Sequence, residues 1–171
     1  MNTTDLSLFI LQLGVGLTFA AHGAQKVFGW WGGPGLAGWE GAIAHMGFRP
    51  ARFFARTSAL SELGGGLLLA AGLLTPLAAA MLVAQAVVII GHVHWRHGFF
   101  NAQSGIEFPL LLGLGAAAVG FAGASAISVD ALLGFAVESS MQVMAVIGGI
   151  VAGLVTLAIP RLGSQGAATS A

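Results

Sequence analysis

Residues 63–91 form an almost continuous apolar run of 29 residues, and this run restricts the chain to few folds. As one helix the run would extend about 43 Å at 1.5 Å per residue, well beyond the roughly 30 Å hydrocarbon core of a bilayer. Thr75-Pro76 interrupts the run, and proline ends or bends a helix. We therefore predict a helical hairpin with one membrane span over residues 53–74 and the next over residues 77–95.

Further apolar segments fit transmembrane helices. Only 7% of the residues are charged, whereas soluble domains carry roughly 25%. The segments cover residues 6–28, 107–121 and 141–159, and Pro160-Arg161 is expected to end the last helix. The sequence thus predicts an all-α, polytopic membrane helix bundle that forms one domain over residues 1–171, with a loop over residues 29–50.

Composition excludes several classes of function. The absence of cysteine excludes disulfides, Cys-ligated iron–sulfur clusters and Cys-based zinc sites. A net charge of zero without a basic run argues against nucleic-acid binding. Residues 1–5 lack the positive region of a secretory signal peptide, so we expect the first apolar segment to be retained as a span.

The cations predict the orientation in the membrane, because Lys and Arg beside short loops are retained on the cytoplasmic side. They are Lys26, Arg49, Arg52, Arg56, Arg96 and Arg161. With spans at the positions above, all of them fall on one side, which predicts a plasma-membrane protein with an outer N-terminus and a cytoplasmic C-terminus. The same side carries Trp30, Trp31, Trp39 and Trp95, and the outer side carries Asp5, Asp130 and Glu138.

Glu62 is the most informative single residue, because a helix that starts near Pro50 places it about 18 Å along the span. A carboxylate at that depth costs several kcal/mol unless it is paired, protonated or in contact with water. Gly64-Gly65-Gly66 allows another helix to approach closely. On such a helix, His22 or Lys26 could pair with the Glu62 carboxylate. A structural ion pair and a functional site both explain Glu62. For Lys26 alone, snorkelling to the interface is the simpler interpretation.

Histidines cluster at the end of the third span. His94 and His97 are about 60° apart on a helix and can share a face, whereas His92 points elsewhere. This spacing resembles part of a metal site but fixes no zinc or iron geometry, so we predict no metal site. Solvation at the interface explains His97 and also His45 in the first loop. His94 is the candidate site residue.

Glu107 has a structural and a functional interpretation. Ser104-x-x-Glu107 fits a capping box at the start of the fourth span. A helix that starts near Glu107 also keeps Pro109 in the first turn, and the carboxylate interacts favourably with the helix dipole. Glu62 and Glu107 are the two acids near the polar interior of the helices. Glu107 is therefore a candidate site residue as well.

Gly149-x-x-x-Gly153 in the last span is a close-packing motif. Small residues at this spacing let two helix backbones approach closely. We expect an interface there, which can serve a homo-oligomer.

Several motifs, in sequence order, resemble those of the DoxX family of small bacterial and archaeal membrane proteins. The most specific is the segment at residues 22–35, HGAQKVFGWWGGPG. Further matches are ELGG at 62–65, GLLT at 72–75, HWxxGFF at 94–100, GIE at 105–107, GxxG at 120–123 and SVD at 128–130. The resemblance covers residues 6–134.

The resemblance implies a core of four transmembrane helices, with residues 141–159 as an additional fifth helix. It also implies a role in oxidoreduction, because members are labelled oxidoreductases and the name is shared with the small membrane subunit of archaeal thiosulfate:quinone oxidoreductase. The family's recurring polar positions match His22, Lys26, Glu62, His94 and Glu107. The chain departs from the family at Gln12 and Pro76, where arginine is common, and at Ile106, where tyrosine is usual.

These residues lead to a hypothesis about function. We predict an integral membrane subunit of an oxidoreductase system, in which Glu62, His94 and Glu107 are catalytic while His22 and Lys26 bind a quinone-like molecule. One alternative is a non-catalytic anchor or assembly subunit, which holds a soluble redox enzyme at the cytoplasmic face through the Trp-rich first loop. Another is a small-solute or proton conduit, although no inverted repeat is visible. An alternative cofactor is a haem between His22 and His94, but nothing in the sequence places these histidines opposite each other.

Overall fold

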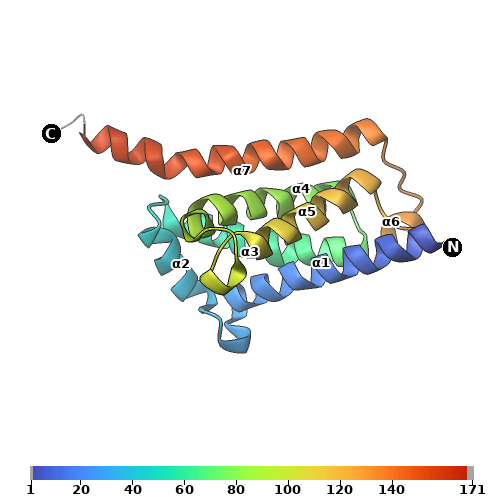
Figure 1. Cartoon of the computed structure of the whole chain (residues 1–171), viewed down its shortest axis with the longest axis horizontal. Helices are drawn as coiled ribbons and strands as arrows, with labels where there is room; N and C mark the ends of the chain where they lie inside the picture. Colours follow the sequence, from blue (N-terminus) through green and yellow to red (C-terminus); the bar gives the residue numbers. More distant parts are fainter. Residues whose placement is uncertain (1, 169–171) are drawn as a thin grey trace.

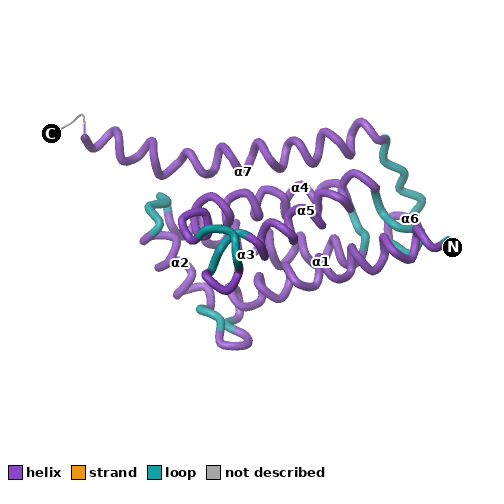
Figure 2. Tube along the Cα trace, in the orientation of Figure 1, coloured by secondary structure: helices purple, strands orange, loops and turns teal. Residues whose placement is uncertain are grey.

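The computed structural model describes the backbone of residues 2–168 and the side chains of residues 2–160, and every regular element within them is helical. Five long helices run along the long axis of the molecule, and the loops gather at its two ends (Figures 1 and 2). They are α1 (Thr3–Phe28), α3 (Ala51–Ala71), α4 (Thr75–Ile89), α5 (Glu107–Ala122) and α7 (Ser139–Ala168). The predicted all-α, polytopic helix bundle is confirmed.

Three segments of the described chain are long and apolar enough to cross a membrane: Thr3–Phe28, Thr75–His97 and Ser139–Pro160. The other two long helices do not meet both requirements, each for a different reason. α3 has 21 residues, about 32 Å of helix, but contains Arg52, Arg56 and Glu62. α5 is apolar but has 16 residues, about 24 Å of helix. That α3 and α5 are also spans stays a prediction.

The hairpin expected at Thr75-Pro76 is present between α3 and α4. α3 ends at Gly72, whose φ of 61° lies in the left-handed region that glycine adopts at little cost. α4 begins at Thr75, with Pro76 in its first turn, where the missing N–H has no intrahelical acceptor. Proline therefore starts the second arm rather than bending a single long helix.

Asp130 caps α4 from a distant part of the chain. Its carboxylate accepts hydrogen bonds from the backbone N–H groups of Leu74 (2.8 Å) and Thr75 (2.9 Å) and from the hydroxyl of Thr75 (2.8 Å). In return the N–H of Asp130 donates to the carbonyl of Gly72 at 2.8 Å. Asp130, which is expected on the outer side of the membrane, is only 3% exposed within the protein. The short helix α6 (Val129–Leu132) thereby fastens the α3–α4 turn.

The predicted loop over residues 29–50 is largely helical, which corrects the sequence expectation. It contains the 3-10 turn η1 (Trp30–Gly32) and the helix α2 (Gly35–His45). Leu36, Trp39 and Ile43 recur at helical spacing, a pattern that indicates a helix even in a short glycine-rich stretch.

Arg52 and Arg56 of α3 both form ion pairs with one acidic residue of α2. Glu40 lies 3.6 Å from Arg52 and 3.6 Å from Arg56. Exposed ion pairs of this kind contribute little stability. They do explain why the first arm of the hairpin tolerates two cations near its start.

The close-packing motif of α7 is used inside the chain. A Cβ on Gly149 would lie 2.5 Å from the carbonyl of Ala80, and one on Gly153 would lie 2.7 Å from Cβ of Val87. Both glycines are buried against α4, so the predicted interface is present but its partner is α4 rather than a second copy. The helix also continues past Pro160, where the sequence predicted its end, because proline removes a single backbone bond and a long helix bends there.

α1 and α3 form the closest helix pair of the bundle. A Cβ on Gly66 would overlap the backbone of Ala20 and lie 2.6 Å from the carbonyl of Gly16. A Cβ on Gly16 would lie 2.5 Å from the backbone nitrogen of Ala70, and one on Gly23 would overlap Leu63. The close helix approach expected from the glycine triplet is therefore present, and α1 is the helix that packs against it.

We predict that Gly66→Ala lowers the free energy of unfolding by about 2 kcal/mol, because the added methyl group cannot fit between the two backbones. Gly64→Ala is the matched control, since a Cβ there has no heavy atom within 4 Å. Alanine also favours a helix over glycine, so this variant should be unchanged or slightly more stable. Equilibrium unfolding in mixed micelles measures both, and equal effects would contradict the close contact.

We predict that Asp130→Ala lowers the free energy of unfolding by about 3 kcal/mol, because buried donors at the start of α4 lose their acceptor. The control is Glu138→Gln, an exposed acid that follows α6. The same unfolding assay compares them. A loss for Asp130→Ala no larger than that of the control would show that the cap is dispensable.

Candidate functional site

A buried ion pair joins the end of α1 to the middle of α3. Nζ of Lys26 lies 2.5 Å from Oε1 of Glu62, and the two side chains are 14% and 1% exposed. Nζ also lies 4.3 Å from the ring centroid of Trp39 on α2, within cation–π distance. The pair compensates the Glu62 charge at a depth where a lone carboxylate is costly. Of the two predicted partners, Lys26 is the one found, and its ammonium does not snorkel to the surface.

The glycine contact between α1 and α3 is what makes this pair possible. Gly23 lies one turn before Lys26, and its Cα packs directly on the backbone of Leu63, next to Glu62. A side chain at Gly23 would separate the helices and lengthen the distance from ammonium to carboxylate.

Two polar atoms beside the ion pair have no hydrogen-bond partner among the residues that the structure describes. They are Oε2 of Glu62, an acceptor, and Nε1 of Trp39, a donor. Most buried polar groups in folded proteins are hydrogen-bonded, because an unpartnered one loses its hydration without compensation. A free donor and a free acceptor on neighbouring residues therefore indicate a place where a small polar molecule binds.

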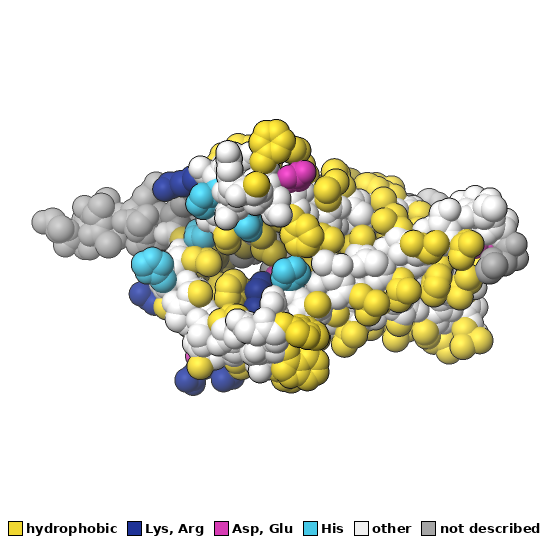
Figure 3. Space-filling model, turned by 60° about the horizontal axis from the view of Figure 1, so that its bottom comes forward, with side chains coloured by type: hydrophobic (Ala, Val, Ile, Leu, Met, Phe, Trp, Pro, Cys, Tyr) yellow, Lys and Arg dark blue, Asp and Glu magenta, His cyan; other side chains and the backbone are white. Residues whose placement is uncertain are grey.

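Both residues line a cavity of about 220 Å³. Its polar lining consists of His22, Lys26, Trp39, Glu62 and His94. Its apolar lining includes Phe19 of α1, Ile89 of α4, and Phe108 and Leu112 of α5. On the space-filling surface the molecule is hollowed at this end, with a basic side chain inside the hollow and a histidine at its edge (Figure 3).

The two histidines of the cavity are held differently. Nδ1 of His94 lies 2.5 Å from the carbonyl of Ser104, which fixes the ring, and Nε2 has no hydrogen bond to a described residue. His94 belongs to the π-helical turn η2 (Ile90–His94), which widens the end of α4. His22 packs edge-to-face on Phe108 at 5.8 Å between ring centroids. It is more exposed and stands at the edge of the cavity.

Glu107 does not belong to this group. Its Oε2 accepts a hydrogen bond from the backbone N–H of Asn101 at 2.9 Å, and Glu107 is outside the set of described residues that line the cavity. α5 begins at Glu107, as expected from Pro109, although the carboxylate closes the preceding loop instead of completing a capping box with Ser104. Glu107 thus closes its own loop and does not line the cavity with Glu62 and His94.

The remaining histidines of the cluster also have structural roles. Nε2 of His92 lies 3.0 Å from the carbonyl of Met46, and its ring packs on Phe48. His97 bonds back to the carbonyl of Val93 in its own turn. His97 is outside the described lining of the cavity, so it does not join His94 there, and the shared helix face of the two histidines stays a prediction.

Trp39 is the site residue that the sequence interpretation missed. It was taken as an interfacial tryptophan because residues 29–50 were expected to form a loop. The helical spacing of Leu36, Trp39 and Ile43 was the available signal, since it places one face of α2 against the bundle.

The size of the cavity restricts what can bind. Sites for drug-sized molecules occupy about 300–1,000 Å³, and an engineered cavity of about 150 Å³ holds benzene. A cavity of about 220 Å³ therefore accepts a single ring but not the four-pyrrole macrocycle of a haem between His22 and His94. Among residues 2–160, no group of three or more His, Asp or Glu is arranged to hold a metal ion.

Comparison with known proteins identifies the family. The family model DoxX matches residues 7–95, just over half of the chain. Neither a curated protein nor a solved structure gives a significant match. The matched segment contains His22, Lys26, Glu62 and His94, and thus the four cavity residues expected from the sequence. With its long apolar helices and this match, the chain is an integral membrane protein and belongs to the DoxX family.

Proposed function

We propose that the protein is the membrane subunit of an oxidoreductase system and that its 220 Å³ cavity binds the ring of a quinone-like molecule. One observation carries the proposal. A cavity of single-ring size is lined mainly by apolar side chains, yet five residues that can donate or accept a proton or hydrogen bond surround it.

The chemistry of the lining suits a quinone. Its two carbonyl oxygens accept hydrogen bonds, and the Lys26 ammonium and the indole N–H of Trp39 are donors. Because Nδ1–H of His94 donates to the carbonyl of Ser104, Nε2 of the neutral ring is an acceptor suited to a quinol hydroxyl, and it donates to a quinone only as the imidazolium. Phe19 and Phe108 supply aromatic surface for the ring itself.

Reduction of a quinone to a quinol requires two electrons and two protons. In this proposal a partner protein supplies the electrons, and the cavity residues supply the protons. One proton comes from Nε2 of His94 as the imidazolium, and the other comes from the Lys26 ammonium, which the Glu62 carboxylate holds at the cavity. Water returns a proton to each group after the transfer.

The partner docks at the end of the molecule that carries the cations, which we propose is the cytoplasmic end. Lys26, Arg49, Arg52, Arg56 and Arg96 all lie at this end. Trp30, Trp31 and Trp95 are exposed there, as expected of aromatic residues at a membrane interface. The N-terminus then lies outside and α7 ends in the cytoplasm.

A second candidate function is a non-catalytic anchor for a soluble redox enzyme. The exposed indoles of Trp30 (54% exposed) and Trp31 (70% exposed) favour it, because they lie beside α2 at the same end. The ion pair would then be structural only. Affinity purification from native membranes separates the two, since a stoichiometric soluble partner whose activity survives Glu62→Gln supports the anchor.

We predict that Lys26→Met and Glu62→Gln each lower the free energy of unfolding by about 3 kcal/mol, because each leaves a buried charge or dipole without its partner. The double variant should be more stable than either single variant, since it leaves no unpaired charge. The matched control is Arg56→Met with Glu40→Gln, a pair at 3.6 Å whose arginine is 54% exposed. There each change should cost less than about 1 kcal/mol. If the double variant lost as much free energy of unfolding as the two single variants together, Lys26 and Glu62 would not be strongly coupled.

We predict that the purified protein binds a short, chain-less benzoquinone and that Glu62→Gln and His94→Gln each weaken binding about tenfold. The first change releases the Lys26 ammonium that donates to the ring, and the second removes the imidazole that contacts it. Quenching of tryptophan fluorescence measures binding, and quinol formation with an artificial electron donor measures turnover. Glu138→Gln, far from the cavity, should bind like the unmodified protein. Absence of binding to the unmodified protein would refute the proposed function.

A further inference from the structure

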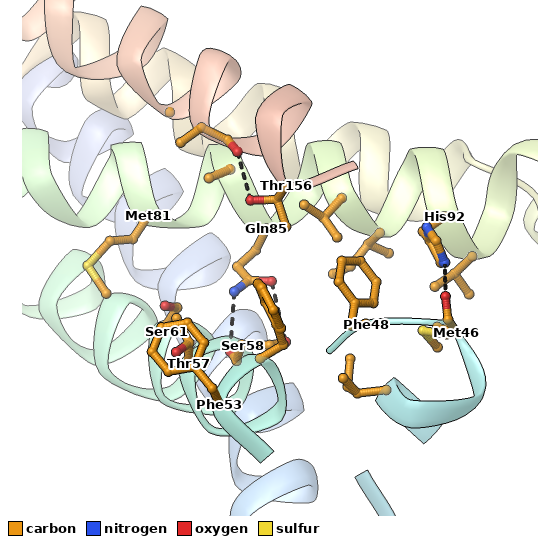
Figure 4. A pocket seen from close by; sticks show the side chains of 18 of the residues that line it. Met46, Phe48, Phe53, Thr57, Ser58, Ser61, Met81, Gln85, His92 and Thr156 are labelled. Carbon is orange, nitrogen blue, oxygen red and sulfur yellow. Dashed lines mark hydrogen bonds between the residues drawn. The ribbon is translucent and has the colours of Figure 1, made fainter. Parts of the chain in front are cut away.

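A second and larger cavity of about 430 Å³ lies between α3, α4 and α7 (Figure 4). α4 packs against both other helices and forms the floor, while α3 and α7 form the sides. Met46 and Phe48 from the loop after α2 close one end. Phe53, at the start of α3, lines the cavity and is 59% exposed, so the cavity opens on the side of the bundle that faces lipid.

Several polar groups of this larger cavity are hydrogen-bonded within the described chain, whereas the indole N–H of Trp39 is not. The side chains of Ser58 and Gln85 contact each other at 3.5 Å, and the hydroxyl of Thr156 donates to the carbonyl of Ala152 at 2.8 Å. His92 is bound to Met46, as described above. Most of the remaining lining is aliphatic, aromatic or thioether. The cavity is therefore mainly apolar and is suited to a hydrocarbon chain.

The two cavities share a wall. Trp39, Ile89 and Val93 line both of them, so a single layer of side chains separates the larger cavity from the smaller one. The indole N–H of Trp39 has no hydrogen-bond partner, so packing and the contact with Lys26 hold this ring. Trp39 is the largest of the three wall residues, and it contacts both spaces.

We propose that the larger cavity holds the long hydrocarbon chain of the same molecule whose ring occupies the smaller cavity, with Trp39 at the junction of ring and chain. The inference rests on the proposed function and narrows its ligand class to lipid-soluble quinones that enter sideways from the bilayer. A helix of a second copy is a poor occupant, because a helix is about 10–12 Å across and 430 Å³ holds about one turn of it. A thin, flexible chain fits the same volume.

The test uses the full chain in lipid nanodiscs and a benzoquinone whose alkyl chain ends in a photoreactive diazirine. After illumination, mass spectrometry locates the label. We expect it on the residues of the larger cavity, such as Phe53, Met81 and Gln85. An excess of long-chain quinone without the diazirine should remove the label, because both compete for one site.

A matched pair of glycine variants controls the test. Gly148 lines the larger cavity and a Cβ there meets no heavy atom within 4 Å, so Gly148→Phe fills the cavity without a backbone clash. Gly64 is equally free of neighbours but lies outside the lining, so Gly64→Phe is the control. We expect Gly148→Phe to reduce labelling about tenfold and Gly64→Phe to leave it unchanged. Binding of the chain-less quinone should be the same in both variants.

Each other outcome overturns a defined part of the inference. Label scattered over lipid-facing residues, or unaffected by Gly148→Phe, overturns the chain site, and the proposed function stands if the chain-less quinone still binds. In another outcome, a diazirine phospholipid labels these residues equally, without displacement by long-chain quinone. That result would show that ordinary lipid fills the cavity, and it would overturn the chain site as well. If no quinone binds in either form, both the chain site and the proposed function fail.

Discussion

The structure depends on how closely α1 approaches α3. Moving a carboxylate and an ammonium out of water costs several kcal/mol per ion, and only a short separation between them returns that energy. Gly16, Gly23 and Gly66 remove the side chains that would hold the helices apart, so Lys26 and Glu62 reach 2.5 Å. α2 then covers the pair with Trp39, and the ends of α4 and α5 close the remaining space into a cavity. The site is a consequence of the packing of two helices rather than of a loop placed on a scaffold.

Much of this was predictable from the sequence, because a bilayer imposes local rules. Apolar length, one proline and a glycine triplet sufficed to predict the α3–α4 hairpin, the depth of Glu62 and a close partner helix. The roles of Asp130 and Trp39 were not predictable in this way. Asp130 binds Thr75, which is 55 residues away, and no local pattern marks a carboxylate that caps a distant helix. Trp39 was missed because a short helix between glycines carries a weak signal.

The candidate site was predictable to a similar degree. His22, Lys26, Glu62 and His94 were expected to share a polar interior, and the structure brings them to one cavity. Glu107 was expected there too, but it begins a helix. At that position a carboxylate is attracted to the free N–H groups of its own loop, and the N–H of Asn101 is in reach. Acids at helix starts have such local partners, whereas Glu62 in mid-helix does not. The position of an acid within its helix therefore separates the two cases.

The ion pair also determines the charge of a suitable ligand. An isolated Lys26 would attract anions, and a cavity at the end of a helix bundle would then suit a small acid or an oxyanion. Glu62 neutralises that charge inside the lining, so an anion would have to compete with a carboxylate 2.5 Å from the ammonium. A neutral ring with carbonyl oxygens needs no such competition, because it can accept a hydrogen bond from the indole N–H of Trp39. The larger cavity behind the same wall also favours a neutral, lipid-soluble molecule, because its lining is mainly apolar. Charge compensation and the shared wall are independent features of the packing, and both select against a water-soluble anionic substrate at this site.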